Sequence, residues 1–198
     1  PFGAYQLSRE EGVRSAIRFF KEGGAEAVKL EGGRKRAELI EALVQAEIPV
    51  MGHIGLTPQS VHVQGGYRVQ GRTLESAMDL LADAQAVEDA GAFALVLEGI
   101  PRELARLITR RLRIPTIGIG AGPDCDGQVL VFHDLLGLTF SRPAKFVRRY
   151  ADLAGTIRQA VERFSADVNS GCFPEDRECY HWPDGLVSQF EKEVARKA

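Results

Sequence analysis

The sequence contains few cysteines, little net charge and no long apolar run. Its three cysteines, Cys125, Cys172 and Cys179, match neither a disulfide framework nor a four-ligand zinc site. The net charge of -2 argues against the strongly basic surface that nucleic-acid binding requires. No segment approaches the ~20 apolar residues of a membrane span, and no charged leader with an apolar core is visible. We therefore expect a cytoplasmic protein with reduced thiols that binds neither nucleic acid nor a membrane.

What the sequence does contain is an alternation of short apolar runs with amphipathic segments. The 198 residues, 44% of them hydrophobic, are enough for one core, and we expect a single domain over 1–198. The alternation predicts an α/β fold with a parallel sheet and right-handed crossovers. The expected strands are 25–30, 48–54, 93–97, 115–120 and 129–132, and the expected helices are 8–24, 34–47, 73–90, 101–113, one from 146 to 168 and a short one from about Leu186.

Five strands are about three fewer than a (β/α)₈ barrel needs. The pattern therefore leaves two possibilities, an open α/β sheet or the rear part of a barrel. The segment 56–72 is longer than an ordinary connection and rich in glycine and glutamine, which is typical of a lid or binding loop. For the apolar face of the helix over 146–168, we expect core packing, with a subunit interface as the alternative.

Two stretches, 27–33 and 94–99, are each an apolar run that ends in a carboxylate followed by glycine. Parallel strands release polar side chains at their carboxyl ends, where barrel enzymes keep their active sites. Burying Lys29, Glu31 and Glu98 there is costly unless they bind something. These residues predict a catalytic site, and the alternative is a pair of ordinary strand ends with solvated charges. His53 ends the intervening strand.

Five segments in this order resemble those of the ketopantoate hydroxymethyltransferases. They are Val-Lys-Leu-Glu-Gly-Gly at 28–33, Gly-His-Ile-Gly-Leu-Thr-Pro-Gln at 52–59, Leu-Glu-Gly-Ile-Pro at 97–101, Ile-Gly-Ile-Gly-Ala-Gly at 117–122 and Asp-Gly-Gln-Val-Leu-Val at 126–131. The segment at 52–59 is highly specific, whereas the glycine run alone would be weak. The resemblance implies a (β/α)₈ TIM barrel of the phosphoenolpyruvate/pyruvate-binding superfamily, of which this chain covers roughly the last five β/α units.

The resemblance also implies an activity. Such an enzyme transfers a hydroxymethyl group from 5,10-methylenetetrahydrofolate to 3-methyl-2-oxobutanoate, which gives 2-dehydropantoate for pantothenate synthesis. It uses Mg²⁺, because a 2-oxo acid can chelate a hard cation that then stabilises the enolate. The family forms homo-oligomers, typically decamers.

Residue by residue, the resemblance makes Glu98 the proton acceptor, Lys29 the group that holds the substrate's negative charge, and Glu31 a metal carboxylate that acts directly or through water. His53 is a further candidate for the active site. The two main metal aspartates of the family would precede Pro1, so we expect the native protein to have about 60–80 more residues, enough for the missing β/α units.

Each assignment has a structural alternative. Glu98 could cap the N-terminus of the helix near Pro101, where a carboxylate is favoured, and Lys29 and Glu31, on one side of a strand, could pair with each other. His53 could be a hydrogen-bonded packing residue. For the whole chain, the alternatives are a related metal-dependent 2-oxo-acid lyase or aldolase, and an inactive barrel fragment that acts only in assembly.

Overall fold

The computed structural model describes residues 1–197, and its centre is one sheet of five parallel strands. The strands lie side by side in sequence order, as β1 (Val28–Glu31), β2 (Val50–Gly55), β3 (Ala94–Glu98), β4 (Thr116–Ile119) and β5 (Gly127–Gln128). A doubly wound sheet reverses its strand order at a switch point, whereas a barrel keeps it. The chain is accordingly a partial β/α barrel.

One helix precedes the first strand and others connect the first four strands, and these helices begin and end close to the predicted positions. They are α1 (Arg9–Gly23), η1 (Arg34–Arg36) with α2 (Ala37–Gln45), η2 (Pro58–Ser60) with α3 (Leu74–Asp89), and α4 (Arg102–Arg111). The side chain of Ser8 accepts a hydrogen bond from the N–H of Glu11, and Gly24 ends α1 in the left-handed conformation. Thr73 caps α3 through a reciprocal pair of bonds with Ser76. The expected helix starts at Ser8 and Thr73 are thus confirmed.

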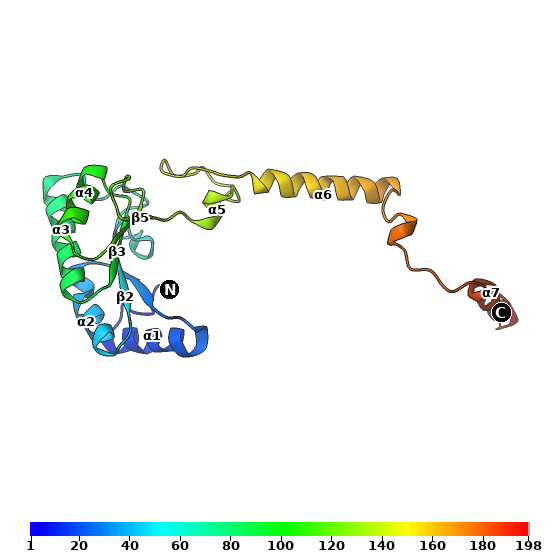
Figure 1. The fold of residues 1–198 in the computed structure, drawn as a ribbon, viewed down its shortest axis with the longest axis horizontal. Coiled ribbons are helices and arrows are strands. Elements are labelled where there is room, and N and C mark those ends of the chain that lie inside the picture. Colours follow the sequence, from blue (N-terminus) through cyan, green and yellow to red (C-terminus); the bar gives the residue numbers. More distant parts are fainter. Residues whose placement is uncertain (198) are drawn as a thin grey trace.

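The hydrophobic core lies between these helices and one face of the sheet, as Figure 1 shows for α2, α3 and α4. It is built from alternate strand residues and from the inner faces of the helices, chiefly Leu30, Val50, Ile54, Leu95, Leu97, Ile40, Leu43, Ala84, Val87, Ala105 and Ile108. Because side chains alternate along a strand, the residues between them face the opposite side of the sheet. Lys29, Glu31, His53 and Glu98 all belong to that second set.

The fifth strand is shorter and earlier than predicted. It is Gly127–Gln128, not 129–132, and Phe132 instead begins the short helix α5 (Phe132–Leu135). The edge of β4 pairs with it through backbone groups, and the N–H of Val129 continues the pattern by donating to the carbonyl of Gly118 at 3.0 Å. Backbone pairing does not require apolar side chains, so the apolar run placed the strand wrongly.

The last third differs from the prediction in its start and in its packing. The helix α6 (Leu153–Ser170) begins after Phe146 and Tyr150, because Asp152 caps it by accepting the N–H of Gly155 at 3.1 Å. Figure 1 shows α6 extending away from the sheet. Its apolar face is exposed, with Val161 at 61%, so the expected core packing is wrong within this chain.

The chain continues through η3 (Asp176–Glu178) to α7 (Leu186–Lys197), which begins where the sequence predicted a short helix. None of the helices within residues 1–197 combines the length and the hydropathy that crossing a bilayer would need.

Candidate active site

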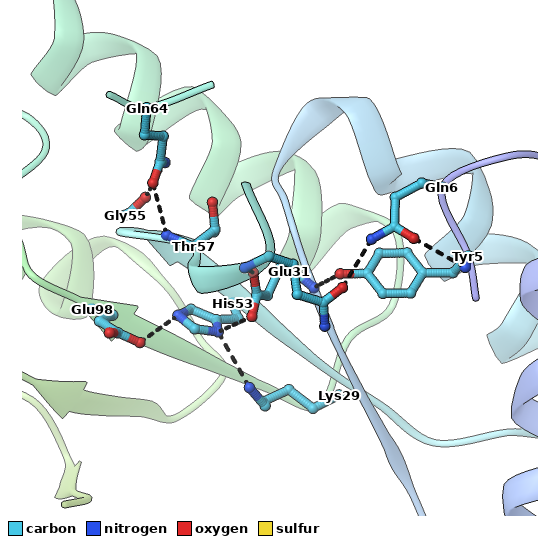
Figure 2. A network of polar contacts seen from close by, with 10 residues as sticks. Tyr5, Gln6, Lys29, Glu31, His53, Gly55, Thr57, Gln64 and Glu98 are labelled. Carbon is cyan, nitrogen blue, oxygen red and sulfur yellow. Dashed lines mark hydrogen bonds and ion pairs between the residues drawn. The ribbon is translucent and has the colours of Figure 1, made fainter. Parts of the chain in front are cut away.

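Four side chains from three neighbouring strands meet at the carboxyl end of the sheet. Figure 2 shows Lys29 and Glu31 from β1, His53 from β2 and Glu98 from the end of β3 around one centre. The parallel register pairs Glu31 with His53, and Gly55, two residues later, with Glu98. The strand ends that carry the motifs are therefore adjacent in space, and they bring together every site residue that the sequence singled out.

His53 lies at the centre of this group, and its side chain is only 2% exposed. Its Nδ1 atom is 3.3 Å from Nζ of Lys29 and 3.9 Å from Oε1 of Glu31. Its Nε2 atom is 3.1 Å from Oε2 of Glu98. The imidazole thus separates a lysine and a carboxylate on one side from a second carboxylate on the other.

Two of the structural alternatives are contradicted. Within residues 1–197, no ion pair joins Lys29 to Glu31, since the polar neighbour of the lysine is His53. Glu98 does not cap α4, because Pro101 is the cap residue and no side chain bonds there. Glu98 turns toward His53 (Figure 2).

Glu31 is held from two directions, by Tyr5, which no sequence pattern indicated, and by Gln59, the last residue of the specific segment at 52–59. Its backbone N–H donates to the hydroxyl of Tyr5 at 3.1 Å, and its Oε2 atom accepts the N–H of Gln59 at 2.9 Å. Burial raises the pKa of Tyr5 above its ordinary value of 10.0. Tyr5 precedes α1, and no pattern in its own segment signals this contact.

Hydrogen bonds of glutamine side chains hold the long loop over 56–72 beside the site. The side chain of Gln64 accepts the N–H of Thr57 and donates to the carbonyl of Gly55, both at 3.1 Å. Gln6 donates to Oε1 of Gln59 at 2.9 Å, which joins the loop to the N-terminal segment. These bonds fix the start of the loop over Glu31 (Figure 2).

The described residues do not by themselves form a magnesium site. Within 1–197, no three histidine, cysteine, aspartate or glutamate side chains come together as metal ligands. Mg²⁺ requires near-octahedral oxygen coordination. Glu31 offers a single carboxylate, of which Oε1 accepts no hydrogen bond in the described part of the chain. Glu31 could therefore be one ligand of the ion but cannot supply its whole coordination sphere.

The sequence match agrees with this arrangement. Residues 1–176 match the sequence model of the family described as ketopantoate hydroxymethyltransferase. The chain belongs to this family. The match with the family model ends at the first residue of η3, so helix α7 lies beyond the part that the model covers.

Curated relatives in the ketopantoate hydroxymethyltransferase family are similar over almost all of this chain. A 3-methyl-2-oxobutanoate hydroxymethyltransferase of Koribacter versatilis is 59% identical over 197 residues, which is 100% of this chain and 67% of that protein. The 3-methyl-2-oxobutanoate hydroxymethyltransferase 2 of Bradyrhizobium diazoefficiens is 56% identical, over 94% of this chain and 63% of the relative. The 3-methyl-2-oxobutanoate hydroxymethyltransferase of Saccharopolyspora erythraea is 59% identical, over 88% of this chain and 59% of that protein. The chain therefore spans roughly three fifths to two thirds of the length of these relatives.

Proposed function

We propose that this chain carries the proton-abstracting half of an active site that transfers a hydroxymethyl group to 3-methyl-2-oxobutanoate. The observation that carries the proposal is the convergence of Lys29, His53 and Glu98 at one end of the sheet, with Glu31 beside them. The names of the relatives supply the substrate. The donor, 5,10-methylenetetrahydrofolate, comes from the family resemblance.

Glu98 is the proposed base. Its carboxylate lies at the carboxyl end of β3 with 15% of the side chain exposed, so a substrate can reach it while most water is excluded. It removes the proton from C3 of the 2-oxo acid, and the electron pair of that C–H bond forms the C2=C3 bond of an enolate. Lys29, a donor with a fixed positive charge, offsets the negative charge of the bound acid.

Water hydrolyses the methylene group of the folate: both of its C–N bonds break, the two nitrogens take the protons of the water, and tetrahydrofolate leaves. C3 of the enolate then bonds to the one-carbon unit, now at the level of formaldehyde, as its C=O double bond opens, and the resulting alkoxide takes the proton that Glu98 had removed. The products are 2-dehydropantoate and tetrahydrofolate. Mg²⁺, when bound, would supply positive charge near the enolate oxygen, and Glu31 is the residue of this chain proposed to lie at the ion.

A direct assay distinguishes this reaction from the lyase or aldolase alternative. The whole protein is incubated with 3-methyl-2-oxobutanoate and Mg²⁺, with and without 5,10-methylenetetrahydrofolate, and the products are identified by mass spectrometry. Folate-dependent gain of one hydroxymethyl group supports the proposal. Cleavage of a 2-oxo acid without folate would support the lyase, and no product would support a fragment that acts only in assembly.

The decameric state and cytoplasmic location rest on the resemblance and sequence expectations, and stay predictions.

A further inference from the structure

We propose that His53 is a positioning residue, held as a neutral imidazole with its proton on Nε2, that connects the ammonium of Lys29 to the carboxylate of Glu98. The role in catalysis rests on the function proposed above. The tautomer does not, because it follows from the contacts of the ring alone.

The ring nitrogen of His53 that carries the proton follows from the one donor that faces the ring, Lys29. The ammonium of Lys29 has hydrogens to donate and no lone pair with which to accept. At 3.3 Å from Nζ, the Nδ1 atom of His53 must therefore be the acceptor. A neutral imidazole with an acceptor at Nδ1 carries its proton on Nε2. The carboxylate of Glu31 does not reverse this assignment, because its Oε1 atom lies 3.9 Å from Nδ1, beyond hydrogen-bond range.

The proton on Nε2 has one partner within reach. The atom is fully buried, and it makes no well-aligned hydrogen bond within residues 1–197, although Oε2 of Glu98 is only 3.1 Å away. Leaving a buried N–H unpaired is costly, so there is a driving force to align the two groups. Rotation of the Glu98 carboxylate about its terminal bond is soft and can supply the alignment. Catalytic contacts are often imperfect without substrate and improve when it binds.

This contact fixes one oxygen of the base and leaves the other for the substrate. With Oε2 accepting from His53, the Oε1 atom of Glu98 is the one that takes the C3 proton. The bond persists after proton transfer, because Oε2 of the resulting carboxylic acid still accepts. His53 therefore neither gains nor loses a proton in the reaction. By contacting both residues, His53 holds Glu98, which removes the proton, in a fixed position relative to Lys29, which binds the acid.

The tautomer can be measured without substrate. The other three histidines, His62, His133 and His181, are exposed, so replacing all of them with glutamine leaves His53 as the only imidazole. A long-range ¹H–¹⁵N correlation spectrum of that ¹⁵N-histidine-labelled protein at neutral pH is expected to show one neutral ring protonated at Nε2. A ring protonated at Nδ1, or an imidazolium, would overturn the inference whatever the enzyme does.

Two substitutions of His53 separate its two contacts. In His53→Asn, the amide oxygen can still accept from Lys29 near the position of Nδ1, but no donor reaches Glu98. In His53→Gln, the longer amide can place an N–H near the position of Nε2, but the contact with Lys29 is lost. Loss of alignment at a reacting group costs about 10²-fold in rate, so His53→Asn should lower kcat by that factor and leave KM within about threefold. His53→Gln should keep kcat within about tenfold and raise KM for the 2-oxo acid.

The kinetic readout is the rate at which C3–H of 3-methyl-2-oxobutanoate exchanges with D₂O as the acid is varied. Equal losses of kcat in both variants, or a more active His53→Asn, would contradict a positioning role and return His53 to packing. If the unsubstituted protein shows no exchange, the proposed function fails, and the spectrum of His53 still decides the tautomer.

Discussion

The backbone of Gly55 packs directly against the carbonyl oxygen of Glu98, and a β-carbon on Gly55 would overlap that oxygen. The neighbouring residue, Leu56, donates its N–H to the same oxygen at 2.8 Å. The proposed base is therefore anchored to the end of β2 through its main chain. Gly55 also has φ +93, a conformation that side chains rarely adopt.

Replacing Gly55 with alanine should displace the end of β3 and the base with it. The expected cost is about 3 kcal/mol in the free energy of unfolding, because backbone strain and overlap with fixed backbone atoms add. Gly65→Ala is the matched control, since Gly65 also has positive φ, at +70, but open space around it. It should cost only about 1–2 kcal/mol. Denaturant unfolding of both variants measures the difference, and equal costs would show that the contact with Glu98 is unimportant.

Glu88 should make stability depend on pH. The residue is buried at 8% exposure, and its Oε1 accepts the backbone N–H groups of Arg113 and Ile114. Burial acts to raise the pKa of Glu88, but these bonds and that from Gln85 outweigh it, so the pKa lies below its ordinary value of 4.5. A lowered pKa means that the unfolded chain takes up the proton first on acidification. The stabilisation is therefore complete above about pH 4.5 and is lost as pH falls through the folded pKa.

The Glu88→Gln variant keeps an acceptor of similar shape but removes the charge. It should be less stable than the parent by about 1 kcal/mol at pH 7, since bonds to a charged acceptor are stronger than bonds to a neutral one. The gap should close below the folded pKa. Unfolding measured from pH 7 to pH 3 tests this, with Glu41→Gln on the exposed side of α2 as control. A gap that stays constant across that range would mean that the charge of Glu88 is irrelevant.

Lys29 should determine how tightly the 2-oxo acid binds. Lys29→Met keeps much of the length of the side chain and removes its charge, so KM for 3-methyl-2-oxobutanoate should rise at least about tenfold, the range expected for a bond to a charged group. Lys35→Met, exposed in η1, should leave KM unchanged. The saturation curve of C3–H exchange gives both values. An unaltered KM in Lys29→Met would remove the lysine from the binding site.

The three strand ends that build the site were predictable because apolar runs locate buried strands and parallel strands align their carboxyl ends. Those runs also identified Lys29, Glu31 and Glu98, and a shared motif identified His53. Gly127–Gln128 could not be located in this way, because it pairs through its backbone and carries no apolar side chain. The exposure of α6 was equally inaccessible, since an amphipathic face indicates a need for burial and not the surface that provides it.

The contacts of the site residues depended on information that short segments do not hold. Tyr5 reaches Glu31 from before α1, and Gln64 turns back to Gly55 from within a loop. The proton position on His53 depends on three strands together, because Lys29 and Glu98 must both be placed before the ring can be assigned.

The most direct test of the account is the rate of C3–H exchange of 3-methyl-2-oxobutanoate in D₂O, followed by proton NMR with and without Mg²⁺ and without folate. Glu98→Gln in the whole protein is compared with the parent and with Glu103→Gln, an exposed glutamate in the first turn of α4. Removing a general base should lower the rate by about 10²–10⁴-fold, so the account predicts that loss for Glu98→Gln and none for Glu103→Gln. Exchange that persists in Glu98→Gln would contradict the choice of base, and absence of exchange in the parent would contradict the proposed reaction.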